Sequence, residues 1–433
     1  MASKVNILQN IAKRGYAVAP QTAACLGKLE VSTLSNKAVV ASLGCGPKSL
    51  VKVAVAFRAG SRYENPENFG VSHVLRSSAG LTTACASSFI IQRSLQQIGA
   101  NLTTVSDRET LVYILESTCN NVSEGLEILR KAITGQEFRP WELSDNIPRI
   151  LAELATLPPQ AKVLDLIHRA AFRTGLGNSV FARSFNVKKI GSETIQHYAS
   201  SNLVAEKAAI TGCGLPHSNL SAFAESLDLK TGSGGNPSPS KYAGGEVRVD
   251  ETLPHVHTIV AAEAPGLNSP DVLPYAVLRF ALGAGPAIIR GVGSSPLSKI
   301  SGECSAAQAL SIAHSDAGLF GIYVAAKPTE AKQAVEAAVK ILKGGVTDQD
   351  VNRGKAQLKS AILQAADSCQ GIVEDLAGQS LLAGTPKIAS DLAEEVSKVS
   401  TQQVQQALQK IISGRKSLAA IGNTGHVPYL DEL

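Results

Sequence analysis

The fold is indicated by residues 53–80, VAVAFRAGSRYENPENFGVSHVLRSSAG, which align without a gap with residues 258–285, TIVAAEAPGLNSPDVLPYAVLRFALGAG, at an offset of 205 positions. Each stretch opens with small and branched apolar residues, a pattern typical of a buried strand. A polar loop that contains proline follows, and an apolar helix-like segment then ends at Ala-Gly. The chain therefore contains the start of one structural unit twice.

Two further pairs of segments repeat in the same order. Residues 147–154 (IPRILAEL) match residues 351–358 (VNRGKAQL) at an offset of 204, and residues 190–198 (IGSETIQHY) match residues 399–407 (VSTQQVQQA) at an offset of 209. Each match is weak by itself, but matches in one order along both halves are what a duplicated domain produces. We therefore expect two homologous domains.

The segment between the two halves has the composition of a linker. Residues 231–245 (TGSGGNPSPSKYAGG) consist mainly of Gly, Ser, Pro and Asn, and such a composition predicts a flexible connection. We expect an N-terminal domain over residues 17–230 and a C-terminal domain over residues 246–433.

Both halves mix strand patterns with helix patterns. This mixture predicts an α+β fold in which each domain is a mixed β-sheet with helices packed mainly on one face. Residues 331–342 place their apolar side chains on one side of a helix, which suits packing against a sheet. The expected strands are 51–57, 111–116, 207–212, 258–262, 318–325 and 417–421, and the expected helices include 122–133, 147–157, 331–342 and 401–412.

The N-terminus has the pattern of a mitochondrial presequence. Residues 1–16 contain three basic residues and no acid, and Val5, Leu8, Ile11 and Ala12 fall at helical spacing. Cleavage after residue 16 would start the mature chain at residue 17 and lower the net charge from +5 to +2. The alternative interpretation is an ordinary N-terminal helix with a frayed end.

The overall composition excludes several classes of protein. Hydrophobic residues make up 44% of the 433 residues and charged residues 18%, which argues against global disorder. The net charge of +5 and the aromatic content of 4% do not suit a nucleic-acid-binding protein. The apolar stretch 272–289 is interrupted by Pro, Gly and Arg, so we expect no membrane-spanning helix there. Seven scattered cysteines without a CxxC motif suit a reducing compartment rather than a metal site.

The doubled plan, the helix-forming segment around His73 and the Gly/Ser/Pro-rich linker resemble the pitrilysin/insulinase-type zinc peptidases. Within that superfamily, residues 283–291 (GAGPAIIRG), 315–323 (SDAGLFGIY) and 413–433 (SGRKSLAAIGNTGHVPYLDEL) are similar to the core proteins of mitochondrial ubiquinol–cytochrome c reductase, complex III. The resemblance extends along the whole mature chain and implies a processing-peptidase-like fold for both domains.

The active peptidases of this superfamily have an inverted zinc motif, His-x-x-Glu-His, and a further glutamate downstream. Two histidines four positions apart share a helix face and bind zinc, while the glutamate between them activates a water molecule. Here His73 matches the first histidine, Arg76 stands at the glutamate position, Ser77 stands at the second histidine, and Glu153 matches the downstream ligand. A guanidinium repels a metal ion and does not accept a proton at neutral pH. We therefore expect no catalytic residue and no metal or cofactor site.

The resemblance implies a noncatalytic subunit needed for assembly and stability of complex III. The implied partners are core protein 1, cytochrome b, cytochrome c1, the Rieske iron–sulfur protein and the small subunits of a dimeric complex, without nucleic acid. The haems and the iron–sulfur cluster would lie in those partners. The implied location is peripheral, on the matrix side of the mitochondrial inner membrane.

A second family member leaves an alternative open. The noncatalytic subunit of the mitochondrial processing peptidase also lacks the full zinc motif and uses a flexible glycine-rich loop on presequences. Gly283, Gly285 and Gly291 stand at a comparable place and form a candidate peptide-contact loop. Pro286 and two isoleucines interrupt this segment, which favours a simple loop that ends a helix. Vestigial presequence processing together with core protein 1 is a further interpretation.

Overall fold

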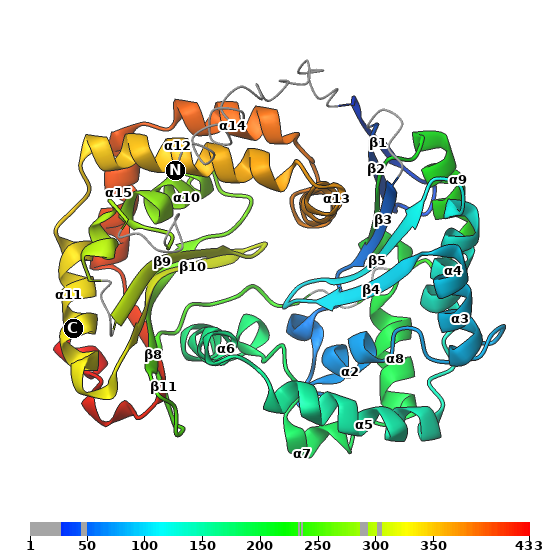
Figure 1. Cartoon of the computed structure of the whole chain (residues 1–433), viewed down its shortest axis with the longest axis horizontal. Coiled ribbons are helices and arrows are strands. Elements are labelled where there is room, and N and C mark those ends of the chain that lie inside the picture. Colours follow the sequence, from blue (N-terminus) through cyan, green and yellow to red (C-terminus); the bar gives the residue numbers. More distant parts are fainter. Residues whose placement is uncertain (1–26, 45–49, 233, 235–236, 286–292, 301–304) are drawn as a thin grey trace, which may run out of the picture.

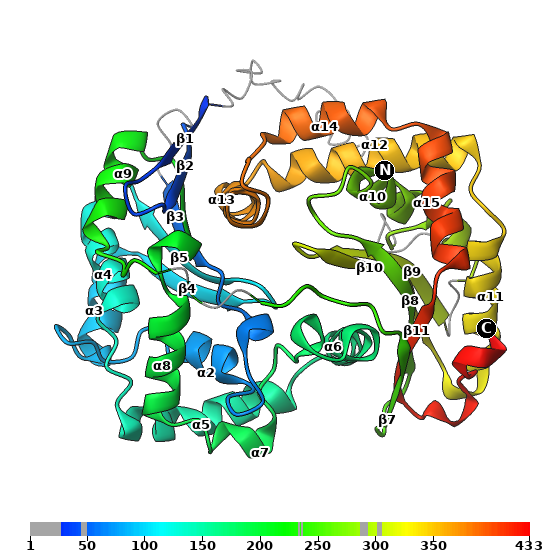
Figure 2. The same cartoon turned by 180° about the vertical axis from the view of Figure 1, so that it is seen from behind.

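The computed structural model describes residues 27–44, 50–232, 234, 237–285, 293–300 and 305–433. Two β-sheets, one from each half of the chain, lie on opposite sides of the molecule (Figure 1), and Figure 2 shows the same arrangement from behind. The predicted presequence, residues 1–16, lies outside the described residues. Among the described residues, no helix is both long enough and apolar enough to span a membrane.

Within the described residues the N-terminal sheet has six strands. Its central strands consist of small and branched apolar residues, and β3 is buried along its length after Leu50. A sheet that is covered on both faces requires such a continuous apolar run. In spatial order the strands are β1 (Leu29–Thr33), β2 (Val39–Leu43), β6 (Ala208–Cys213), β3 (Leu50–Phe57), β5 (Leu111–Thr118) and β4 (Asn101–Ser106).

The C-terminal sheet repeats the order and directions of five of these strands. Its described strands are, in spatial order, β7 (Gly245–Asp250), β11 (Lys416–Gly422), β8 (Val256–Pro265), β10 (Ala317–Ala326) and β9 (Ser305–Ala313). The first pair is parallel in both sheets, β2 with β6 and β7 with β11, and the next neighbours are antiparallel.

The strand register confirms the repeat of 53–80 in 258–285. Val55 of β3 lies between Tyr113 and Ile210. Val260, its equivalent at the offset of 205, lies between Ile322 and Leu418 of the second sheet.

Helices from the same half cover one face of each sheet. The helical segments predicted from the repeat are present: 147–154 lies in α5 and 351–358 in α12. Helices α12 and α15 each begin with a capping box, from Thr347 with Asp350 and from Ser400 with Gln403. The N-terminal half contributes α2 (Val71–Ser77), α3 (Ser88–Ile98), α4 (Val122–Thr134), α5 (Pro140–Ala155), α6 (Pro159–Phe172), α7 (Ser184–Val187), α8 (Ser192–Asn202) and α9 (His217–Ser226). The C-terminal half contributes α10 (Val272–Leu282), α11 (Ala331–Lys343), α12 (Asp348–Ala365), α13 (Cys369–Gly378), α14 (Ala389–Lys398) and α15 (Thr401–Ser413).

The other face of each sheet is covered by a helix from the opposite half. Alternate residues of a strand point to opposite faces, so Val53 and Val55 face the helices of their own half while Ala54 packs in a cluster with Val373 and Leu376 of α13. In the same way, helix α6 of the N-terminal half packs on β8 and β11 of the C-terminal sheet. The two halves therefore exchange one covering helix each. Figure 1 shows α13 beside β3 and α6 beside β8 and β11.

A buried ionic cluster joins the two halves. The guanidinium of Arg62 donates to Glu109 Oε1 at 2.6 Å and to Asp316 at 2.5 and 2.9 Å, and its side chain is 3% exposed. Glu109 lies in the turn between β4 and β5, and Asp316 lies in the equivalent turn between β9 and β10. The backbone N–H of Ser315 also donates to Glu109 at 2.8 Å. Equivalent turns of the two sheets therefore meet at one arginine.

Parts of the segment predicted as a linker make specific hydrogen bonds. Within 231–245, the described residues before β7 contain no helix or strand. The N–H of Ser240 donates to Asp316 at 2.8 Å, and the N–H of Ala243 donates to the carbonyl of Ala171 at 2.7 Å. The hydroxyl of Tyr242 lies 2.7 Å from Ser417 Oγ. This segment therefore contacts the ionic cluster, α6 and the C-terminal sheet.

Replacement of Arg62 with methionine should lower the free energy of unfolding by about 3–5 kcal/mol, because Glu109 would stay buried without its partner. Urea unfolding followed by circular dichroism measures this change. Arg130 is a matched control, because it pairs with Glu127 at 2.9 Å on the surface. Arg130→Met should change the stability by no more than about 0.5 kcal/mol. Equal losses in the two variants would contradict the importance of the buried cluster.

Candidate functional site

Helix α2 begins at a position that requires glycine. Gly70 has a φ of 94°, and a Cβ atom there would lie 2.6 Å from the Cβ of Ala182. Glycine alone tolerates both this conformation and this close approach. The tight contact brings the first turn of α2, which contains His73, against the segment that precedes α7.

His73 is a buried, neutral imidazole. Its side chain is 1% exposed, and Nδ1 accepts a hydrogen bond from the N–H of Ala182 at 3.2 Å. Because Nδ1 is the acceptor, the proton of the neutral ring lies on Nε2, which is 3.5 Å from Glu153 Oε1. Burial lowers the pKa of His73, as does nearby Arg76, while Glu153 acts in the opposite direction. The ring of Phe181 packs edge-on with a centroid distance of 6.1 Å.

The structure brings three of the four zinc-motif positions together. The guanidinium of Arg76 donates to Glu153 Oε1, the same oxygen that faces His73. Partial burial acts to raise the pKa of Glu153, but the charge and hydrogen bond of Arg76 outweigh it and the pKa is lowered. This carboxylate is therefore ionised at neutral pH, with Arg76 as its partner.

Ser77 lies apart from this cluster. Its side chain is buried, and its hydroxyl has no hydrogen-bond partner among the described residues. Its carbonyl accepts a hydrogen bond from Asn146 Nδ2 of α5 at 3.1 Å. The position of the second histidine therefore serves packing between α2 and α5.

Glu64 is a buried carboxyl that sequence reasoning did not identify. Its two oxygens accept hydrogen bonds from the N–H of Gly70 at 2.8 Å, the N–H of Ser72 at 2.9 Å and the hydroxyl of Ser72 at 2.6 Å. The two backbone donors are free N–H groups at the start of α2. Burial raises the pKa of Glu64 to about 7, and the hydrogen bonds oppose this rise. Its position in a polar loop before a helix is the one sequence signal that points to this role.

The described residues of the candidate peptide-contact loop, Gly283 and Gly285, follow α10 in the C-terminal half. Gly283 ends α10 with a φ of 130°, and its carbonyl accepts a hydrogen bond from the N–H of Ala309 on β9 at 2.8 Å. Gly285 also has a positive φ, of 111°. Gly291 lies outside the described residues. The described contacts are those of a loop that ends a helix.

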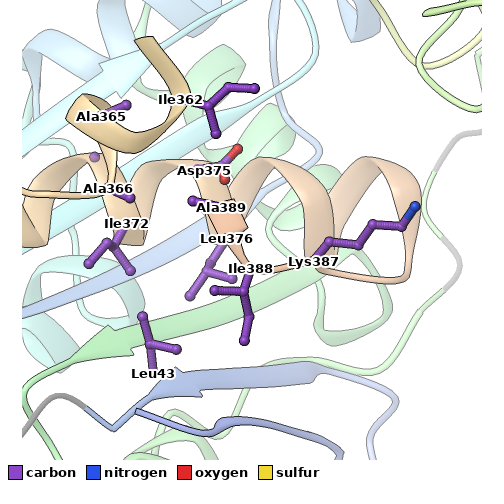
Figure 3. Close-up of a pocket in the computed structure, with 11 residues that line it drawn as sticks. Leu43, Ile362, Ala365, Ala366, Ile372, Asp375, Leu376, Lys387, Ile388 and Ala389 are labelled. Atoms are coloured by element: carbon purple, nitrogen blue, oxygen red, sulfur yellow. The ribbon is translucent and has the colours of Figure 1, made fainter. Parts of the chain in front are cut away.

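An apolar pocket lies where helices α12, α13 and α14 meet β2. Figure 3 shows Ile372 and Leu376 of α13 pointing toward Leu43 of β2, with Ile388 beside them. The pocket has a volume of about 40 Å³, which has no room for a cofactor. Its carboxyl, Asp375, has a pKa raised by burial. Among the described residues no group of three or more His, Cys, Asp or Glu side chains is placed to hold a metal ion.

Glu64→Gln should remove a pH-dependent part of the stability. Because the pKa of about 7 lies above the ordinary value of 4.5, the folded chain binds a proton more tightly than the unfolded chain between these values. Wild-type stability should therefore fall as the pH rises through this window.

The glutamine does not titrate, so the variant should gain up to about 3 kcal/mol relative to wild type across the window. Urea denaturation at pH values below and above the window measures this difference. Glu67, an exposed residue of the same loop, provides the control. A pH-independent difference between Glu64→Gln and wild type would contradict the buried titration.

Comparisons with known proteins assign the family. Residues 39–184 match the family model described as insulinase (peptidase family M16), and residues 189–358 match the model described as peptidase M16 inactive domain. Individual relatives agree with these family models. The chain is 32% identical to human cytochrome b-c1 complex subunit 2, mitochondrial, over 94% of this chain and 92% of the human protein. The protein of the same name from Cryptococcus neoformans is 29% identical over 90% of this chain and 90% of the fungal protein. The probable mitochondrial-processing peptidase subunit alpha-1 of Arabidopsis thaliana is 27% identical over 94% of this chain and 84% of the plant protein. The chain therefore belongs to peptidase family M16, in the group that includes cytochrome b-c1 complex subunit 2.

Proposed function

We propose that this chain is a noncatalytic core subunit, core protein 2, of the mitochondrial cytochrome b-c1 complex. In this role it supports the assembly and stability of the complex that transfers electrons from ubiquinol to cytochrome c. The observation that supports this function most directly is the 32% identity to human cytochrome b-c1 complex subunit 2 across 94% of the chain. The matches to processing-peptidase alpha subunits are more distant, at 27% or less, so that alternative is not favoured.

The geometry around His73 supports the absence of peptidase chemistry. A zinc site of this family would need the imidazole of His73 and the carboxylate of Glu153 to face a metal ion together with a second histidine. Here the guanidinium of Arg76 occupies the space beside the Glu153 carboxylate, and Ser77 offers no imidazole. These residues do not fit zinc. We infer that the ion pair replaces the metal as the contact between α2 and α5.

The proposed role needs partners to place the chain at the inner membrane. We propose a peripheral position on the matrix side, in contact with core protein 1, cytochrome b, cytochrome c1 and the Rieske protein. The haems and the iron–sulfur cluster would then belong to those partners. Residues 1–16 would act as the mitochondrial presequence. The two domains would correspond to residues 17–230 and 246–433.

Purified full-length protein should contain no stoichiometric zinc, because Arg76 holds Glu153 and no second histidine is present. Elemental analysis after dialysis against zinc and then against buffer checks this. His73→Ala serves as the matched control, since it removes the remaining imidazole. One zinc per wild-type chain that disappears in His73→Ala would overturn the noncatalytic assignment.

Native purification from mitochondria should recover this chain together with cytochromes b and c1. Mild detergent extraction, followed by a native gel and haem spectra of the band, measures this association. The reason is that a core subunit of the cytochrome b-c1 complex would stay bound to the subunits that hold the haems. Recovery in a soluble fraction, paired with a processing-peptidase subunit that contains an intact His-x-x-Glu-His motif, would instead support the alternative.

A further inference from the structure

A cavity lined by three arginines lies beside the start of α2. It has a volume of about 240 Å³ and is open to solvent, and it is lined by the C-terminal half of α6, the loop that follows α6, the start of α2 and the segment before α7. Arg169, Arg173 and Arg183 line it, and all three are exposed. A ligand in solution could therefore reach the three guanidinium groups.

The positive charge of this cavity is not neutralised by the protein. None of the three arginines forms an ion pair with another described residue. The cavity also contains two carboxyls, but both have other donors. Asp165 pairs with Arg108 at 2.7 Å, and Glu64 accepts its hydrogen bonds from the start of α2. Three cations around one cavity repel one another unless an anion lies between them.

The backbone at Arg173 is strained. Arg173 has a φ of 63° and a ψ of −49°, and the N–H of Thr174 donates to the carbonyl of Phe172 at 2.7 Å. This is a γ-turn with positive φ, a rare conformation for a residue other than glycine. Strain of this kind persists at ligand sites, where the position of a side chain matters. Here the turn ends α6 and places Arg173 at the cavity.

A simpler explanation accounts for only part of this arrangement. Cations near the C-terminus of a helix are favoured by the helix dipole, which suits Arg169 and Arg173 at the end of α6. Arg183 comes from a different segment, just before α7, and gains nothing from that dipole. Its guanidinium lies 6.0 Å from the centroid of the Phe185 ring, and the residue also lines the cavity.

We propose that this cavity binds a phosphoryl group, as free phosphate or as a phosphate monoester. A planar guanidinium matches two phosphate oxygens at once, and three such groups suit a dianion better than a single carboxylate. Phe69 and Phe181 add apolar wall beside the arginines, which leaves space for the organic part of an ester. The site lies in the N-terminal half and does not depend on the proposed role in complex III.

Calorimetric titration of the purified full-length chain tests the proposal. The probes are inorganic phosphate, glycerol 3-phosphate and vesicles of phosphatidylcholine with or without phosphatidic acid. Arg169→Gln combined with Arg173→Gln should weaken binding at least about tenfold, because two of three bidentate contacts are lost. Glutamine at position 173 keeps the backbone preference of arginine, so the turn is not altered. Arg183→Gln is a second variant on a separate segment and should also weaken binding.

Arg149→Gln is the matched control, since Arg149 is an exposed arginine of α5 that does not line the cavity. Binding of the soluble phosphates supports a free ligand, and binding only of vesicles with phosphatidic acid supports a lipid headgroup. Absence of binding to every probe overturns the proposal. It is also overturned if the double variant binds as well as wild type, or if Arg149→Gln weakens binding equally.

Discussion

Each sheet of this protein has two apolar faces, and its own half of the chain covers only one of them. Ala54 and Ile114 on the second face of the N-terminal sheet are buried by α13, and Ile259 and Tyr323 of the C-terminal sheet are buried by α6. Exposure of such a face would cost roughly 1.5–3 kcal/mol for each large side chain. Each half therefore needs a helix of the other half to bury the second face of its sheet. Because apolar contact is not directional, the charged cluster at Arg62 adds a defined orientation.

Much of the fold could be predicted because the central strands and the main helices have strong local patterns. The runs at β3, β8, β10 and β11 are apolar on both faces, and α11 is amphipathic. Edge strands such as β4 (NLTTVS) were not predicted, because their polar residues resemble a loop. The exchange of α6 and α13 was also not predicted. An amphipathic pattern shows that a helix has an apolar face but does not say which sheet it covers.

The candidate site was predictable only where a family spacing was available. The spacing assigned His73, Arg76 and Glu153 to positions of the family's zinc motif, and the structure places these three side chains together. Glu64 could not be found this way, because its role depends on how a loop folds back over the start of α2. The arginines of the phosphoryl site come from two segments, and nothing in their sequence spacing shows that they meet at one cavity.

The exchange of helices has a consequence for the order of synthesis. The N-terminal sheet has all of its strands once β6 ends at Cys213, but the helix that covers its second face begins only at Cys369. At about 5–20 residues per second, translation of the intervening chain takes about 8–30 s. During that interval the helix that covers the second apolar face of the N-terminal sheet has not been synthesised. To stay soluble, the nascent chain must remain unfolded or be bound by a chaperone. A chain built this way matures as a whole rather than one domain after the other.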